Sequence, residues 1–225
     1  MPEQQQTLTI KQAIHLGVQH HTAGRLPEAE GIYRKILKTD PDQSVALHLL
    51  GVIAHQVGKN DEAADLITRS LAAKPDYAEA HHNLANVFKK LGKLDEAVAS
   101  CRKALDIKPD YADAHYNMGA VFQAQGKPDE AIAAYNKALL IKPDYVEAHN
   151  NMGNALRGQG KLEESIAAFN KALSIKPDYA EAHNNMGNVL ANQDKAEGAI
   201  AAYNKALLIK PDYAEAHNNM GNALT

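Results

Sequence analysis

The segment 180–192 separates apolar from polar positions in the way an amphipathic helix does. At about 100° of rotation per residue, His183, Met186 and Leu190 fall on one arc of a helix. The opposite arc, about 100° wide by the same geometry, holds polar residues: Glu181, Asn184, Asn185, Asn188 and Asn192. The pattern predicts a helix that runs to about Asn192, with an apolar face toward a partner helix and an amide-rich face away from it.

The residues around this segment mark helix ends. Pro177 ends the preceding helix, and the carboxylate of Asp178 is expected to cap the next one, with Glu181 three residues further on. A second helix is expected to follow the first, after a turn in which Asp194 stands. In five other stretches of the chain the same place holds a glycine, where a left-handed cap is favoured: Gly24, Gly58, Gly92, Gly126 and Gly160.

This unit of two helices recurs along the chain. The motif KPDY begins at Lys74, Lys108, Lys142, Lys176 and Lys210, in steps of 34 residues, and Pro41 stands in the same register one step earlier. No unit can bury its apolar face alone, so the units must stack into one all-α solenoid over 7–225. After a tail at 1–6, the predicted repeats are 7–40, 41–74, 75–108, 109–142, 143–176, 177–210 and the partial repeat 211–225.

Three further sets of residues recur in these repeats. The first helices carry a glycine: Gly17, Gly51, Gly119, Gly153, Gly187 and Gly221. The second helices carry a small residue such as Ala97, Ala131 or Ala199, and then an aromatic residue or its substitute: Tyr33, Ile67, Cys101, Tyr135, Phe169 and Tyr203. The boundaries carry a proline: Pro41, Pro75, Pro109, Pro143, Pro177 and Pro211.

With these residues the chain closely resembles the tetratricopeptide repeat family, whose period is also about 34 residues. The pattern departs from the family at Ala85 (for the glycine), Ser165 (for the alanine) and Asp194 (for the capping glycine). The resemblance implies a right-handed superhelix of antiparallel helix pairs. Its first helices would line a concave groove that binds a peptide or a protein segment.

Asparagines form a column on the predicted groove side of the first helices. The column consists of Asn83, Asn86, Asn117, Asn150, Asn151, Asn154, Asn184, Asn185, Asn188, Asn218, Asn219 and Asn222. The first two repeats instead carry apolar residues and histidines there: Ile14, His15, Val18, His48, Leu49 and Val52. The groove is thus expected to be apolar and His-rich at its N-terminal end and amide-rich beyond it.

Two explanations of the column remain open. Each mid-helix asparagine costs roughly 0.5 kcal/mol relative to alanine, and a carboxamide offers both a donor and an acceptor to the main chain of an extended peptide. This amide ladder is similar to that of the O-linked N-acetylglucosamine transferases, whose superhelix presents asparagines to substrate proteins. Alternatively, repeat duplication spread the asparagines, and some bond only within the array.

Composition narrows the function classes. The 225 residues are 45% hydrophobic and 23% charged, with a formal net charge of −3, so no basic excess favours nucleic acid or an anionic membrane surface. Apolar runs are too short to span a membrane, and the start shows no secretory signal pattern. The single cysteine, Cys101, excludes an internal disulfide and fits a reducing compartment. We therefore expect a cytoplasmic protein.

No candidate catalytic or metal-binding group emerges, and no cofactor is expected. The histidines at the 34-residue period (His81, His115, His149, His183 and His217) lie on successive helices, each about 10 Å across, too far apart to share a zinc ion. Cys101 occupies the aromatic column and is expected to be a buried hydrophobe. Acid pairs such as Asp95–Glu96 and Asp129–Glu130 begin second helices, where they favour the helix dipole.

Charge also limits the partner. Some tetratricopeptide domains clamp a chaperone tail's terminal carboxylate with lysines and an arginine, but here the corresponding turn is acidic: Glu79, Asp113, Glu147, Glu181 and Glu215. We expect a neutral or partly basic segment instead.

Three functional hypotheses follow. The leading one is a non-catalytic scaffold that binds an extended protein segment. The second is the N-terminal recognition arm of a larger bacterial glycosyltransferase or related transferase, since residues 13–37 resemble the openings of such proteins. The third is a solenoid that self-associates through 211–225, whose apolar Met220 and Leu224 lack a polar capping face.

Overall fold

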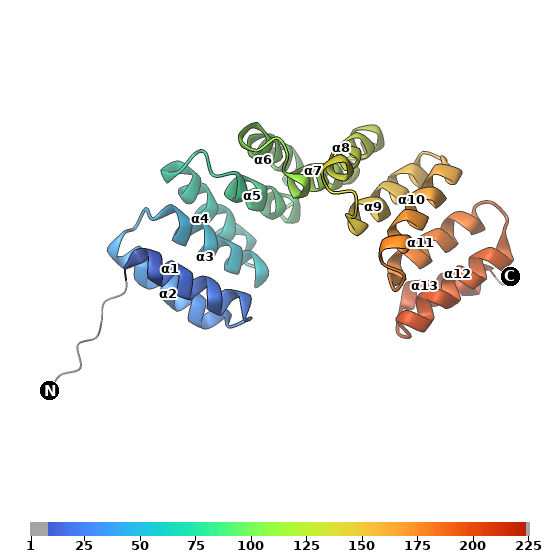
Figure 1. Cartoon of the computed structure of the whole chain (residues 1–225), viewed down its shortest axis with the longest axis horizontal. Coiled ribbons are helices and arrows are strands. Elements are labelled where there is room, and N and C mark those ends of the chain that lie inside the picture. Colours follow the sequence, from blue (N-terminus) through green and yellow to red (C-terminus); the bar gives the residue numbers. More distant parts are fainter. Residues whose placement is uncertain (1–8, 224–225) are drawn as a thin grey trace. The chain divides into compact units, whose positions relative to one another are not determined.

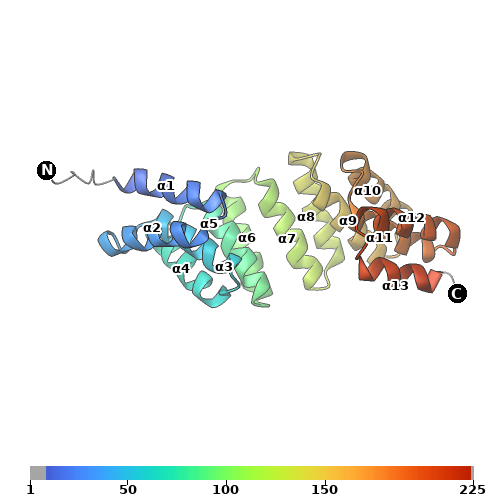
Figure 2. The ribbon, with the colours of Figure 1, turned by 90° about the horizontal axis from the view of Figure 1, so that it is seen from below.

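The computed structural model describes residues 9–223, and every regular element in that range is an α-helix. The chain divides into two compact units, Met1–Pro109 and Asp110–Thr225. Figures 1 and 2 show their helices from two sides. The first unit contains α1 (Ile10–Thr22), α2 (Leu26–Thr39), α3 (Ser44–Gln56), α4 (Asn60–Ala73), α5 (Ala78–Lys90) and α6 (Leu94–Ile107). The second contains α7 (Ala112–Ala124), α8 (Pro128–Ile141), α9 (Val146–Gly158), α10 (Leu162–Ile175), α11 (Ala180–Ala191), α12 (Ala196–Ile209) and α13 (Ala214–Ala223).

Within each unit, helices pack in sequential pairs and the pairs pack on one another. In the second unit α7 packs on α8, α9 on α10 and α11 on α12, while α8 contacts α9 and α10 contacts α11. The first helices α7, α9, α11 and α13 also contact one another in sequence, so they form one layer. The all-α helix-pair architecture predicted from the period is confirmed. The predicted tail 1–6 lies outside the described residues, and one continuous solenoid over 7–225 stays a prediction.

Glycine contacts hold the two helices of a pair close together. A Cβ added to Gly187 of α11 would lie 2.5 Å from Cε1 of Tyr203 in α12, which is well inside van der Waals contact. Gly119 meets Tyr135 and Gly153 meets Phe169 in the same way. The recurrent glycine of the first helix therefore makes room for the aromatic ring of the second, and all three rings are fully or almost fully buried.

The departures from the repeat pattern have local explanations. Where α5 carries Ala85 in place of the glycine, the matching position of α6 holds the small Cys101, and both are buried. The buried hydroxyl of Ser165 donates a hydrogen bond to the carbonyl oxygen of Gly153 at 2.7 Å, so this polar group is satisfied. The structure confirms the prediction of Cys101 as a buried hydrophobe: burial raises the pKa of its thiol to about 12.

The turns between paired helices adopt the predicted left-handed cap. Gly24, Gly58, Gly92, Gly126 and Gly160 all have φ between 70° and 82°. Asp194, at the same place in the sixth repeat, is the one non-glycine residue with positive φ in the described range, at 56°. A side chain with a Cβ is strained in this region, so this turn is less favourable than the others.

The predicted cap of α11 is wrong. The helix begins at Ala180, its N-cap residue is Tyr179, and no side chain caps it. Asp178 lies in the preceding turn and is one residue too early to take the N-cap position. Instead, Nε2 of His183 donates to the carbonyl oxygen of Pro177 at 3.0 Å and ties the first helical turn to the loop.

This loop contact explains the period of the histidines and of the KPDY motif. His81, His149 and His217 make the same bond to the boundary proline of their own repeats, each at 2.9 Å. Because a carbonyl only accepts, the proton is on Nε2 in each case. The lysine of the motif lies over the ring of its tyrosine, 4.4 Å from the centroid for Lys142 and Tyr145. The histidines are thus structural parts of the turns.

Candidate functional site

Asparagines connect successive first helices by hydrogen bonds. Nδ2 of Asn219 in α13 donates to Oδ1 of Asn184 in α11 at 3.1 Å, and Nδ2 of Asn185 donates to Oδ1 of Asn150 in α9 at 3.0 Å. Both pairs are 35 residues apart, one more than the period, because the donor lies one position later in its repeat than the acceptor. We call these contacts the joint bonds.

Other residue types accept the joint bond in other repeats. Nδ2 of Asn151 donates to the hydroxyl oxygen of Tyr116 at 3.0 Å. In the first unit, Nδ2 of Asn83 donates to Nε2 of His48 at 2.8 Å. Asparagine is therefore the constant donor, while the acceptor is an amide, a phenol or an imidazole. One of the two sequence interpretations, bonding within the array, accounts for this part of the column.

Burial separates the column into two groups. Asn184 is 0% exposed, and Asn117 and Asn150 are each 5% exposed. Asn184 uses both ends of its amide, since it accepts from Asn219 and donates to Oε1 of Glu215 at 3.1 Å. The arc opposite the apolar stripe is not open along its whole width, because the next first helix covers one edge. The other asparagines named from the sequence are partly or fully exposed.

His48 shows how the joint differs in the first unit. Its Nε2 accepts from Asn83, so Nδ1 carries the proton and donates to the Tyr77 hydroxyl, 2.9 Å away. His48 is 4% exposed, and burial lowers its pKa to about 4, against a smaller opposing effect of the Glu79 carboxylate. Of the two histidines expected in the N-terminal part of the groove, His48 is therefore buried in a joint bond, whereas His15 is exposed.

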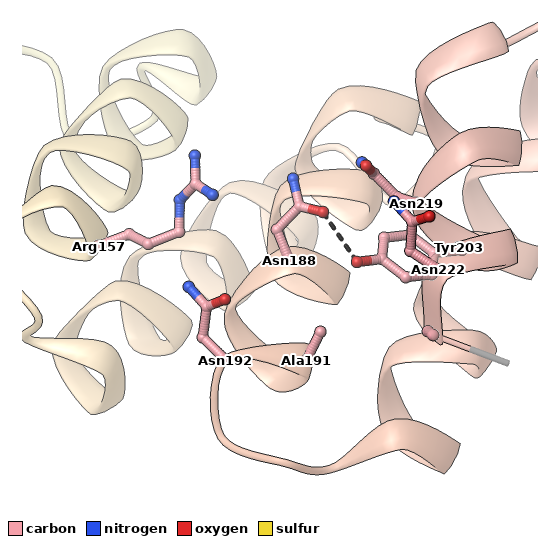
Figure 3. Close-up of a pocket in the computed structure, with 8 residues that line it drawn as sticks. Arg157, Asn188, Ala191, Asn192, Tyr203, Asn219 and Asn222 are labelled. Carbon is pink, nitrogen blue, oxygen red and sulfur yellow. Dashed lines mark hydrogen bonds between the residues drawn. The ribbon is translucent and has the colours of Figure 1, made fainter. Parts of the chain in front are cut away.

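A cavity of about 300 Å³ opens between α9, α11 and α13 in the second unit (Figure 3). Oδ1 of Asn188 accepts from the Tyr203 hydroxyl at 2.8 Å, so Nδ2 is the amide group left for the cavity. In Figure 3 the side chains of Arg157 and Asn188 extend toward the same space. The lining residues are Arg157, Asn188, Ala191, Asn192, Tyr203, Asn219, Asn222 and Ala223.

Sequence reasoning found only part of this cavity. It named Asn188, Asn219 and Asn222 as site residues but missed Arg157, the one charged residue among the described residues of the lining. A signal was present, because the same register near the end of the first helix holds His55 in α3 and Lys89 in α5. The tyrosine hydroxyl that orients Asn188 had no sequence signal.

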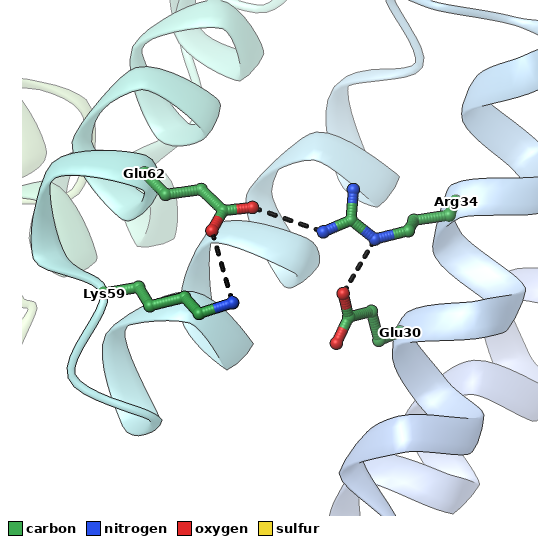
Figure 4. A network of polar contacts seen from close by, with 4 residues as sticks. All are labelled: Glu30, Arg34, Lys59 and Glu62. Atoms are coloured by element: carbon green, nitrogen blue, oxygen red, sulfur yellow. Dashed lines mark hydrogen bonds and ion pairs between the residues drawn. The ribbon is translucent and has the colours of Figure 1, made fainter.

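A second cavity of about 300 Å³ lies in the first unit and is different in character. Its lining is largely apolar, with Leu37, Pro41, Leu50 and Leu66. Three cationic residues complete it: Arg34, Lys38 and Arg69. Arg34 forms two ion pairs (Figure 4): its Nε lies 2.7 Å from Oε1 of Glu30, and its Nη2 lies 3.2 Å from Oε1 of Glu62. Oε2 of Glu62 also lies 3.8 Å from Nζ of Lys59. These exposed ion pairs occupy the guanidinium, so the asparagine-lined cavity is the better candidate site.

The described residues contain no cluster of three potential metal ligands among their His, Cys, Asp and Glu side chains. Within the same range, no helix is long and apolar enough to cross a membrane.

Helix pairs that recur at a fixed period define a helical repeat protein of the solenoid class. A TPR repeat model matches residues 85–126, 153–194 and 193–225, which together exceed half of the chain. Tetratricopeptide repeat models also match 20–87, 112–145 and 134–167. The chain belongs to the tetratricopeptide repeat family.

Solved structures agree with this assignment. MamA is 30% identical, with a TM-score of 0.66, over 73% of this chain and 96% of that one. YrrB, a TPR protein with an unusual peptide-binding site, is 22% identical with a TM-score of 0.65, over 83% of this chain and 96% of YrrB. The APC/C hetero-tetramer Cut9–Hcn1 contains a chain that is 19% identical, with a TM-score of 0.83 over 96% of this chain, which spans 43% of the length of that chain. No curated protein matches the sequence.

Proposed function

We propose that this protein is a non-catalytic scaffold that binds an extended segment of a partner protein along the first helices of the second unit. The observation that carries the proposal is the cavity between α9, α11 and α13, where Asn188, Asn192, Asn219 and Asn222 bring amides together. Amides that donate and accept suit the main chain of an extended peptide, because they bond it without selecting its side chains. Membership of the family and the peptide-binding site named for YrrB support the same function.

The asparagines divide into positioning and ligand-binding roles under this proposal. Asn184 holds α13 on α11 and is fully buried, so it does not reach a ligand. Asn188 keeps Nδ2 for the cavity, and Asn154 has a buried Oδ1 without a donor among the described residues. Exposed carboxylates on the first turns, such as Glu147 and Glu181, favour a neutral or partly basic partner.

A selection with random decapeptides tests the proposal. The wild-type protein is expected to enrich a set of related sequences. The double variant Asn188→Ala and Asn222→Ala should lose about tenfold or more in affinity, since hydrogen bonds with a bound ligand contribute about 1 kcal/mol each. The matched control replaces Asn136 and Asn204, exposed on the second helices α8 and α12, by alanine and should bind as the wild type does. No enrichment by the wild type, or equal losses in both double variants, would overturn the proposal.

Self-association through α13 is a second candidate function, favoured by one observation. A Cβ added to Gly221 would meet nothing within 4 Å, so the surface beside this glycine is open. At the equivalent Gly187, the ring of Tyr203 occupies that space. Met220 lies beside this open notch and is only partly buried; Leu224, named with it from the sequence, lies outside the described residues. Light scattering at rising concentration should reveal association that Met220→Glu abolishes. A wild type that stays monomeric rules this function out.

A further inference from the structure

The cavity of the first unit, between the second helices α2 and α4, combines an apolar wall with positive charge. Leu50 of α3 and Leu66 of α4 are buried parts of this wall, and Leu37 of α2 is half-buried. The volume of about 300 Å³ is at the lower end of ordinary ligand pockets, so there is room for one large side chain. We call this surface the α2–α4 cavity, and its cationic residues are Arg34, Lys38 and Arg69.

Two of these three cations have no ion-pair partner among the described residues. Arg34 belongs to the network of Figure 4, in which two cations face two glutamates, so that network carries no net charge. No carboxylate of residues 9–223 lies within ion-pair distance of the exposed Lys38 or Arg69. Arg69 donates from Nη2 to the carbonyl oxygen of Pro41 at 3.4 Å, which uses one of its five N–H groups. The aspartates on either side of Pro41 do not line the cavity.

The later repeats do not reproduce this combination of residues. At steps of 34 residues, the position of Lys38 is never cationic and holds Ala72, Asp106, Leu140 and Ser174. The position of Leu66 holds only small residues, namely Ser100, Ala134, Ala168 and Ala202. The repeat fold therefore requires neither a lysine nor a leucine at these places, and repeat duplication does not account for the α2–α4 cavity.

We propose that the α2–α4 cavity binds a segment of a partner protein in which acidic residues flank one large apolar side chain. The apolar side chain packs against Leu37, Leu50 and Leu66 and contributes most of the affinity. The carboxylates pair with Lys38 and Arg69 at the rim, where charge complementarity steers and orients the segment. This site lies on second helices and takes an acidic segment, whereas the groove proposed in the second unit lies on first helices and favours a neutral or partly basic one.

A library of dodecapeptides tests the partner's chemistry. Each member carries one leucine, isoleucine or phenylalanine at its centre, glutamate at two of the positions around it, and alanine or serine elsewhere. The wild type is expected to enrich related sequences, and fluorescence anisotropy then measures the affinity of the best peptide. Alanine in place of its apolar residue should weaken binding about tenfold or more. Glutamine in place of both glutamates should weaken it about fivefold, with a smaller effect at high salt.

Two double variants locate the charges. Lys38→Gln with Arg69→Gln should weaken binding of the best peptide about fivefold and abolish its preference for glutamate over glutamine. The matched control, Lys103→Gln with Lys171→Gln, removes two exposed lysines that stand at the place of Arg69 in later repeats, and it should bind as the wild type does. Thermal unfolding checks that both variants retain the fold. Equal losses in the two double variants would reveal attraction by net charge alone and overturn the inference.

NMR of the leucine methyl groups locates the apolar side chain without changing the protein. Addition of the best peptide should shift the signals of Leu37, Leu50 and Leu66. No enrichment from the library, binding that survives loss of the apolar residue, or unchanged signals of these leucines would each overturn the inference. The groove variant with Asn188→Ala and Asn222→Ala should bind the acidic peptide unchanged, and a loss there would place the peptide in the second unit instead. The two sites thus fail independently, because each has its own peptide and its own variants.

Discussion

The amide of Asn219 donates to the side-chain oxygen of Asn184, so two members of one asparagine column bond each other across successive repeats. The same relation joins Asn185 to Asn150. A repeat protein has few contacts between distant residues and depends on the interfaces between neighbours. The joint bonds place a directional contact at the interfaces where Asn83, Asn151, Asn185 and Asn219 donate. A poor helix former is tolerated there because its side chain is satisfied.

Loss of a joint bond should weaken the interface between two neighbouring repeats. Asn184→Ala leaves Nδ2 of Asn219 without its acceptor and removes the bond to Glu215, so we expect the free energy of unfolding to fall by about 1–3 kcal/mol. Asn204→Ala, at an exposed position of α12, should change it by about 0.5 kcal/mol or less. Urea unfolding followed by circular dichroism measures both. Equal stability of the two variants would show that this joint bond contributes nothing to the free energy of unfolding.

The pairing of residue sizes between first and second helices is testable at Ala85 and Cys101. Cys101→Tyr alone should destabilise the protein by about 1–3 kcal/mol, since a larger ring is forced into a packed site. Adding Ala85→Gly recreates the glycine and tyrosine combination of Gly119 and Tyr135. The double variant should recover most of the loss, with a coupling energy above about 1 kcal/mol in a double-mutant cycle. Additive effects would contradict the pairing.

The helix pairs could be predicted because they depend on residues close in sequence and repeated at one period. The joint bonds could not, because helical geometry gives the direction of Asn184 but not the helix that covers it. The predicted cap of α11 is wrong because the turn after Pro177 includes Asp178, and the helix begins only at Ala180. Arg157 was overlooked because it has no equivalent arginine in the other repeats. Of the four asparagines that line the cavity, the sequence names Asn188, Asn219 and Asn222 as site residues, and their role in peptide binding stays a prediction.

The turn at Asp194 should be the weakest inter-helix turn of the second unit. Asp194→Gly removes the strain of a positive φ and should stabilise the protein by about 1 kcal/mol. In the wild type, amides of 194–209 are expected to exchange with solvent faster than those of 160–175, where Gly160 supplies the cap. Hydrogen exchange read by mass spectrometry compares the two segments. Equal protection in the wild type would show that the strain does not reach α12.

The buried His48 should make the first unit sensitive to acid. Its pKa of about 4 in the folded state lies below the value of about 6.5 expected in the unfolded chain. The folded state therefore binds fewer protons, so the stability contributed by neutral His48 is complete above pH 6.5 and declines as the pH falls toward 4. The difference corresponds to at most about 3 kcal/mol. Protonation would also place a hydrogen on Nε2, opposite the Nδ2 donor of Asn83.

The chain itself supplies the matched variant for this prediction. His48→Asn places an amide at the position that Asn150 and Asn184 occupy in later repeats, where it accepts the joint bond and does not titrate. The charges of Glu79 and His82 also act on His48, but both residues are present in both proteins, so their effect is common to the two. The two proteins should have similar unfolding free energies at pH 7.5 and diverge below pH 6, with the variant the more stable. Parallel curves of urea unfolding from pH 7.5 to 4.5 would show that His48 does not control the acid sensitivity.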